Sequence, residues 1–92
     1  MARWLQSGLR RDVCVVVAAN DEPTESAVKR ALESHYGSRV RPKTFFGALD
    51  SLESKGLIER ETDGAHARVS LTERGETDLR AHYEWMTDEL TD

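Results

Sequence analysis

The sequence predicts a mainly α-helical domain with one small β-hairpin, which places it in the α+β class. Three observations carry this prediction. Apolar residues recur at helical spacing in three segments, an Asp63-Gly64 turn signal separates two strand-like runs, and the second run alternates apolar with polar residues. The 92 residues contain no linker, repeat or low-complexity stretch, so we expect one domain spanning residues 1–92.

The apolar run at residues 13–19 leaves two alternatives open. Its β-branched residues favour a strand, but no turn signal precedes it and nothing alternates along it. The segment 20–23 (Asn-Asp-Glu-Pro) then breaks any regular structure. A helix is expected between Thr24, a suitable N-cap, and Gly37, a suitable residue just past a helix end. Its apolar stripe comprises Ala27, Val28, Ala31 and Leu32.

The remaining elements follow from similar signals. Pro42 suits the first position of a third helix, which Gly56 ends. Residues 57–62 form a strand, and the return strand leads to Thr72, the cap of a last helix that runs to about Leu90. The buried face of the third helix comprises Phe45, Ala48, Leu49 and Leu52, with Phe46 on its shoulder. Three helices, a hairpin and a last helix at residues 72–90 make the order of a winged helix-turn-helix.

Charge is acidic overall but unevenly distributed. Seventeen acidic residues outnumber thirteen basic ones, which gives a net charge of −4, and this balance argues against a nucleic-acid partner. A Lys-poor, acid-rich composition is typical of proteins from a concentrated-salt cytoplasm, so we expect a halophilic, cytoplasmic protein. Cys14 is the only cysteine, which excludes an intrachain disulfide, and the run at 13–19 is too short to span a membrane.

The basic residues within 37–48 favour contact with DNA. Arg39, Arg41 and Lys43 stand there with no acid, at the start of the third helix. Bases at a helix start oppose the macrodipole, which favours a functional reason over a solvated helix end. An arginine guanidinium can donate two parallel hydrogen bonds to guanine or to a phosphate. The small side chains of Thr44 and Gly47 would let the helix approach DNA closely.

Further DNA-contact candidates lie along this helix and the hairpin. They are Phe46, Ser51, His66 and Arg68. Arg68 could reach the minor groove from the hairpin, or it could pair with Glu59 or Glu61 across the strands. Asp50 could accept a hydrogen bond from cytosine N4, or it could be a solvated helix residue.

The last helix carries a seam with coiled-coil spacing, formed by Leu79, Tyr83, Met86 and Leu90. We expect this seam to pair with a second copy of the chain, joined by Trp4 and Leu5. The alternative is that the last helix folds back on the first helix of its own chain.

Two stretches resemble a known family of regulators. Residues 43–58 (KTFFGALDSLESKGLI) resemble the recognition-helix signature of PadR-type transcriptional regulators, and Leu71-Thr72-Glu73-Arg74-Gly75 resembles their turn into the last helix. The opening MARWLQSG, with Arg10-Arg11-Asp12 after it, is similar to haloarchaeal proteins resembling the halophage φH repressor. The resemblance implies a dimeric winged-helix repressor whose third helix enters the major groove, and a helical 13–19 segment. Phe46 stands where the family has tyrosine.

Nothing in the sequence indicates an enzyme, a cofactor or a metal site. His35, His66 and His82 fall in three different elements, and Cys14 lies in an apolar run where a thiol is normally inert, with redox sensing as the alternative. We therefore expect a sequence-specific DNA-binding transcriptional regulator, a repressor that binds double-stranded DNA as a homodimer. The alternative is an acidic winged-helix module that binds another protein and no DNA.

Overall fold

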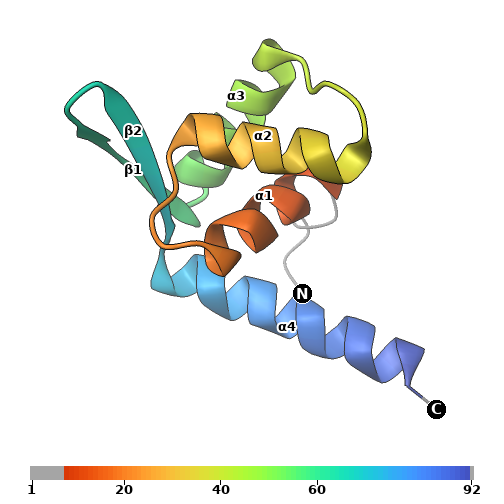
Figure 1. Cartoon of the computed structure of the whole chain (residues 1–92). Helices are drawn as coiled ribbons and strands as arrows, with labels where there is room; N and C mark the ends of the chain where they lie inside the picture. Colours follow the sequence, from red (N-terminus) through yellow and green to blue (C-terminus); the bar gives the residue numbers. More distant parts are fainter. Residues whose placement is uncertain (1–7, 92) are drawn as a thin grey trace.

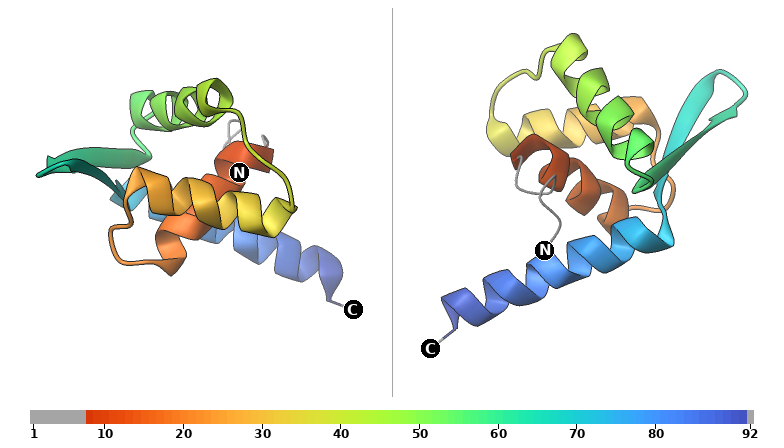
Figure 2. Two further views of the ribbon diagram at one scale, coloured as in Figure 1. Left: turned by 45° about the horizontal axis from the view of Figure 1, so that its top comes forward. Right: turned by 180° about the vertical axis from the view of Figure 1, so that it is seen from behind.

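The computed structural model describes residues 8–91 and contains four helices and one hairpin. The elements are α1 (Gly8–Ala19), α2 (Glu25–Tyr36), α3 (Pro42–Ser54), β1 (Ile58–Asp63), β2 (His66–Leu71) and α4 (Glu73–Leu90). The first three helices pack together, the hairpin projects to one side, and α4 runs beneath α1 and extends beyond it (Figures 1 and 2). This order confirms the predicted α+β class.

The segment 13–19 is helical, which decides between the two alternatives that propensity left open. Val13, Cys14 and Val17 are buried on one face of α1 while Val15 is 49 % exposed. This spacing is that of a helix with one buried stripe. Burial against α2 and α3 therefore overrides the strand preference of the β-branched residues.

The predicted helix caps are present. The Thr24 hydroxyl accepts a hydrogen bond from the Ala27 N–H at 3.1 Å, and the Thr72 hydroxyl accepts one from the Gly75 N–H at 3.0 Å. Gly37 ends α2 in the left-handed region at φ 68°, which glycine adopts without strain.

The hairpin forms as predicted, with its turn one residue later than the Asp63-Gly64 signal. Asp63 pairs with His66 as the last rung of the antiparallel ladder, so Gly64 and Ala65 make the two-residue turn. Gly64 has a φ of 64°, and a positive φ at the first of two turn residues favours glycine there.

The core lies between α1, α2, α3 and the base of the hairpin. Its largest fully buried side chains are Phe45, Leu32, Leu49, Leu52, Leu57 and Ile58. From α4, Leu79 is partly buried against this cluster. Ala31, expected in the stripe of α2, is exposed, because the helix buries only a narrow stripe through Val28 and Leu32. None of the helices described is long and apolar enough to cross a membrane.

Candidate nucleic-acid interface

Three exposed basic side chains lie at the start of α3. Arg41 is the N-cap residue of α3 and makes no side-chain capping bond, and Pro42 begins the helix. Arg39, Arg41 and Lys43 are all exposed, and none of them takes part in a salt bridge within residues 8–91. Their cationic groups are therefore open to an outside anion.

Glu33 holds the connection that carries two of these bases. Its Oε2 accepts hydrogen bonds from the Val40 N–H and from the Lys29 ammonium group, each at 2.9 Å. These bonds lower the pKa of Glu33 below its usual 4.5. The Lys29–Glu33 spacing is a recognisable helix pair, but the sequence gives no sign of the contact with Val40. Glu33 thus fixes the path of the chain on either side of Val40.

Near its start, the exposed face of α3 carries little side-chain bulk around Gly47. Thr44 is exposed, and Phe46 is 42 % exposed with its ring packed edge-on against Phe45 at 5.2 Å between centroids. A Cβ added at Gly47 would meet no atom within 4 Å. The backbone of α3 is therefore open to close approach by another molecule at this point.

Two polar residues further along α3 bind partners within the chain. Asp50 is exposed, but its Oδ1 lies 2.6 Å from Nη2 of Arg60. Ser51 is half-buried, and its hydroxyl accepts a hydrogen bond from Nη1 of Arg10 in α1 at 3.3 Å. Asp50 is thus an ion-pair partner of Arg60, a role that neither alternative from the sequence named, and Ser51 contacts α1.

The hairpin 58–71, here called the wing, carries mostly acids at its surface. Glu59, Glu61 and Asp63 are exposed, as is His66. Arg68 binds Asp63 Oδ2 through Nε at 3.1 Å and donates to the Glu22 carbonyl at 3.0 Å. Arg68 therefore pairs diagonally with Asp63, two residues beyond its direct ladder partner Glu61, and not with Glu59 or Glu61 as the pairing alternative named.

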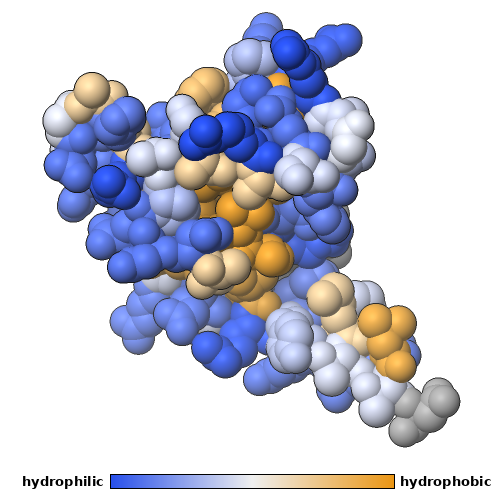
Figure 3. Space-filling model, in the orientation of Figure 1, coloured by the Kyte–Doolittle hydropathy of each residue, from blue (hydrophilic) through white to orange (hydrophobic). Residues whose placement is uncertain are grey.

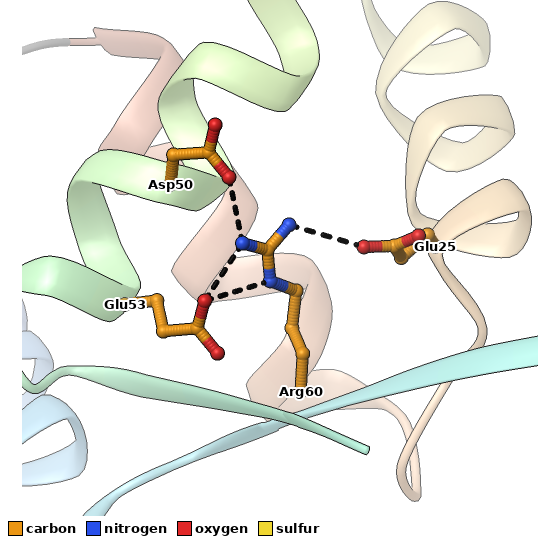
Figure 4. A network of polar contacts seen from close by, with 4 residues as sticks. All are labelled: Glu25, Asp50, Glu53 and Arg60. Atoms are coloured by element: carbon orange, nitrogen blue, oxygen red, sulfur yellow. Dashed lines mark hydrogen bonds and ion pairs between the residues drawn. The ribbon is translucent and has the colours of Figure 1, made fainter. Parts of the chain in front are cut away.

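Arg60 is the residue of this region that the sequence did not single out. From β1 its guanidinium reaches carboxylates on two helices: Asp50 and Glu53 on α3, and Glu25 on α2 (Figure 4). These ion pairs raise the pKa of Arg60, and the hydrogen bonding of its guanidinium to the Glu53 carboxylate is the largest cause. The only indication of this role in the sequence is that Arg60 is a single basic residue between Glu59 and Glu61 of the expected strand.

On the far side of the molecule, α4 and α1 share an apolar surface. Leu79 packs on the chain's own core, as the fold-back alternative requires, whereas Tyr83 is 63 %, Met86 37 % and Leu90 84 % exposed. Between the two helices runs an open groove of about 840 Å³ that Val15 and Tyr83 help to line. Figure 3 shows apolar surface gathered over α1 and again near the end of α4. Trp4 and Leu5, expected to join this surface, lie outside the described residues.

His82 lies on the same helix but is buried, only 4 % exposed. Burial lowers its pKa below 6.5, and the charge of Arg11 lowers it further. Burial also raises the pKa of Cys14 to about 12, which leaves the thiol protonated and unreactive. Among residues 8–91 no three His, Cys, Asp or Glu side chains come together as a metal site would require.

Several solved structures have a fold similar to that of this chain. RosR of H. salinarum is 27 % identical, with a TM-score of 0.86 over 94 % of this chain and 79 % of its own. F93 from STIV, a winged-helix DNA-binding protein, is 13 % identical, with a TM-score of 0.77 over 88 % of this chain and 89 % of its own.

ZitR of Lactococcus lactis is 18 % identical, with a TM-score of 0.75 over 92 % of this chain and 61 % of its own. Comparison with protein-family models and with curated proteins found no match. The chain has the winged-helix fold, with α3 preceding the wing as the sequence order predicts.

Proposed function

We propose that this protein is a DNA-binding transcriptional regulator, a repressor that inserts α3 into the major groove as a homodimer. The observation that carries the proposal is the set of bases Arg39, Arg41 and Lys43, which are exposed and outside every salt bridge of the described chain. Bases of the wing, in contrast, are held by acids of the same chain. The similarity to a winged-helix DNA-binding protein supports the same function.

Phosphate attraction by these bases makes a quantitative test possible. Each neutralised phosphate contributes about −0.9 to the slope of log affinity against log salt, so three bases on each of two copies give a slope of about −5. The Arg41→Ala/Lys43→Ala variant should bind the protein's own upstream DNA more weakly and with a shallower slope, as measured by fluorescence anisotropy.

A matched control uses two bases remote from α3. Arg74→Ala/Arg80→Ala removes the same charge from α4, where both side chains are exposed. It should bind DNA nearly as the unchanged protein does. Equal affinity of the α3 and α4 variants would remove the start of α3 from the interface.

The protein is proposed to repress transcription and to belong to a known family of regulators. Repression requires only that the dimer cover a promoter, so adding the protein to a transcription reaction on its own upstream region should reduce the transcript. The motifs at residues 43–58 and 71–75 support a PadR-type regulator related to φH-repressor-like proteins, and the acid-rich composition supports a halophilic one.

Dimerisation rests on the exposed apolar side chains of α4. Burying the exposed parts of Tyr83 and Leu90, which are 63 % and 84 % exposed, would contribute about 1–2.5 kcal/mol each, which favours pairing through this face. Sedimentation should show a species of about twice 10.4 kDa, and Met86→Glu should shift it to the monomer. Ala81→Glu, on the opposite side of α4, should leave the dimer intact. A monomer at micromolar concentration would contradict dimerisation.

A second function is favoured by the acids of the wing. Glu59, Glu61 and Asp63 would repel phosphate, as a protein-interaction module without DNA binding would tolerate. Under that function the protein would not shift its upstream DNA in a gel even in molar KCl. A shift there would exclude it.

A further inference from the structure

Arg60 joins the wing to both helices of the helix-turn-helix. Its Nη2 lies 2.6 Å from Asp50 Oδ1 and 2.7 Å from Glu53 Oε1, and its Nη1 lies 3.3 Å from Glu25 Oε2. Its side chain is only 20 % exposed, so these contacts are partly shielded from water. Figure 4 shows the guanidinium standing between α3 and α2, with its three nitrogens turned toward the carboxylates.

The charge of α3 changes sign along its length. Lys43 lies in the first turn of the helix, and Asp50 and Glu53 follow two and three turns later without a basic residue between them. Asp50 is seven residues after Lys43 and three after Gly47, so it projects on the same side of the helix. Its side chain is 69 % exposed. A carboxylate at this position would repel the phosphates that Lys43 attracts.

We propose that Arg60 is a positioning residue for DNA binding, which neutralises Asp50 and Glu53 and so allows the later turns of α3 to enter the major groove. The inference rests on the proposed function, because it assumes that α3 meets DNA. The same contacts hold the wing at a fixed distance from α3, since one rigid fork bonds all three carboxylates.

The first test removes the charge of Arg60 and measures binding to the protein's own upstream DNA. Arg60→Gln leaves two carboxylates of α3 without a cation, and its affinity should fall about ten-fold or more at physiological salt. Arg80→Gln is the matched control, because it breaks the exposed ion pair of Arg80 with Glu76 on α4 and changes net charge equally. The control should bind within about two-fold of the unchanged protein.

The second test separates neutralisation from direct contact. If Arg60 acts through the carboxylates, the triple variant Arg60→Gln/Asp50→Asn/Glu53→Gln should regain affinity to within about three-fold of the unchanged protein. Removing two carboxylates from α3 raises affinity for phosphate by itself, so the reference protein for this comparison is the double variant Asp50→Asn/Glu53→Gln. If Arg60 itself binds a phosphate, or if it only stabilises the fold, Arg60→Gln will weaken binding by the same factor in the double variant as in the unchanged protein, and that result overturns the inference.

Arg60→Lys guards against loss of folding. It keeps the cation but lacks the fork, and it should retain more affinity than Arg60→Gln, with thermal unfolding confirming that both variants are folded. Equal losses in the two folded variants would contradict neutralisation. If the unchanged protein binds DNA while Arg60→Gln binds equally well, only this inference fails. If the unchanged protein binds no DNA, the proposed function fails with it.

Discussion

Two glycines in helices should respond in opposite ways to the same substitution by alanine. Gly75 lies in the first turn of α4, and a Cβ there would overlap the Leu57 carbonyl oxygen and lie 2.9 Å from its carbon atom. Gly47 lies in α3, where an added Cβ would touch nothing within 4 Å. Both substitutions add one methyl group to a helix, so the surroundings of that group decide whether the protein gains or loses stability.

The close approach at Gly75 is built into the start of α4. The Thr72 N–H donates to the Leu57 carbonyl at 3.0 Å, and the Thr72 hydroxyl donates to the Gly56 carbonyl at 2.7 Å. Because backbone atoms meet the new methyl group, relief requires the start of α4 to move away from Leu57. Overpacking of this kind costs about 1–3 kcal/mol, so Gly75→Ala should lose about 2 kcal/mol of stability.

Gly47→Ala should instead gain about 0.5–1 kcal/mol, because alanine favours the helix by roughly that amount. In a domain of this size 1 kcal/mol moves the Tm by about 4–8 °C, so Gly75→Ala should melt about 10 °C lower and Gly47→Ala about 4 °C higher. Calorimetry at one fixed protein concentration measures both, since pairing of chains makes Tm depend on concentration. A Gly75→Ala protein as stable as the unchanged one would refute the close contact of α4 with Leu57.

Three further predictions concern titratable side chains. Because Lys29 lowers the pKa of Glu33 in the folded state, Glu33 stabilises the fold above about pH 4.5, and this stability is lost as pH falls through the lowered pKa. Glu33→Gln should flatten that part of a urea-midpoint profile. Burial lowers the pKa of His82, so the unfolded chain takes up a proton first and stability should fall as pH drops below about 6.5. His82→Gln should remove that decline, and an unchanged profile would contradict the burial of His82. Cys14, with its pKa raised to about 12, should react with a thiol reagent at neutral pH only as fast as the chain unfolds, and rapid labelling of the folded protein would contradict this.

Local chemistry made most of the fold predictable. Thr24 and Thr72 cap the expected helices, Gly37 ends α2 and Pro42 begins α3, because each of these signals depends only on neighbours in the chain. The segment 13–19 was ambiguous for the same reason. Its helical state depends on burial against α2 and α3, which local propensity does not contain.

The candidate interface was predictable only in part. The exposure of Arg39, Arg41 and Lys43 follows from their place before and within the first turn of α3. The partners of Arg60 and Ser51 could not be predicted from neighbouring residues, because the Arg10–Ser51 and Glu25–Arg60 contacts join residues 41 and 35 positions apart. Such pairs exist only after the helices and wing have packed.

The net charge of −4 is compatible with the proposed DNA-binding function, because several basic residues outside the start of α3 are neutralised by acids of the same chain. Arg60, Arg68 and Arg80 each bind an acid of their own chain, so they add little to attraction at a distance. At molar ionic strength charges interact over only about 3 Å, so the total charge of the protein has no influence on a DNA strand beyond direct contact. Under the proposed function, binding then depends on the charge of the few side chains that would touch phosphate. The candidates at the start of α3 are positive and take part in no salt bridge within residues 8–91, and Arg60 binds the acids that follow them on the helix.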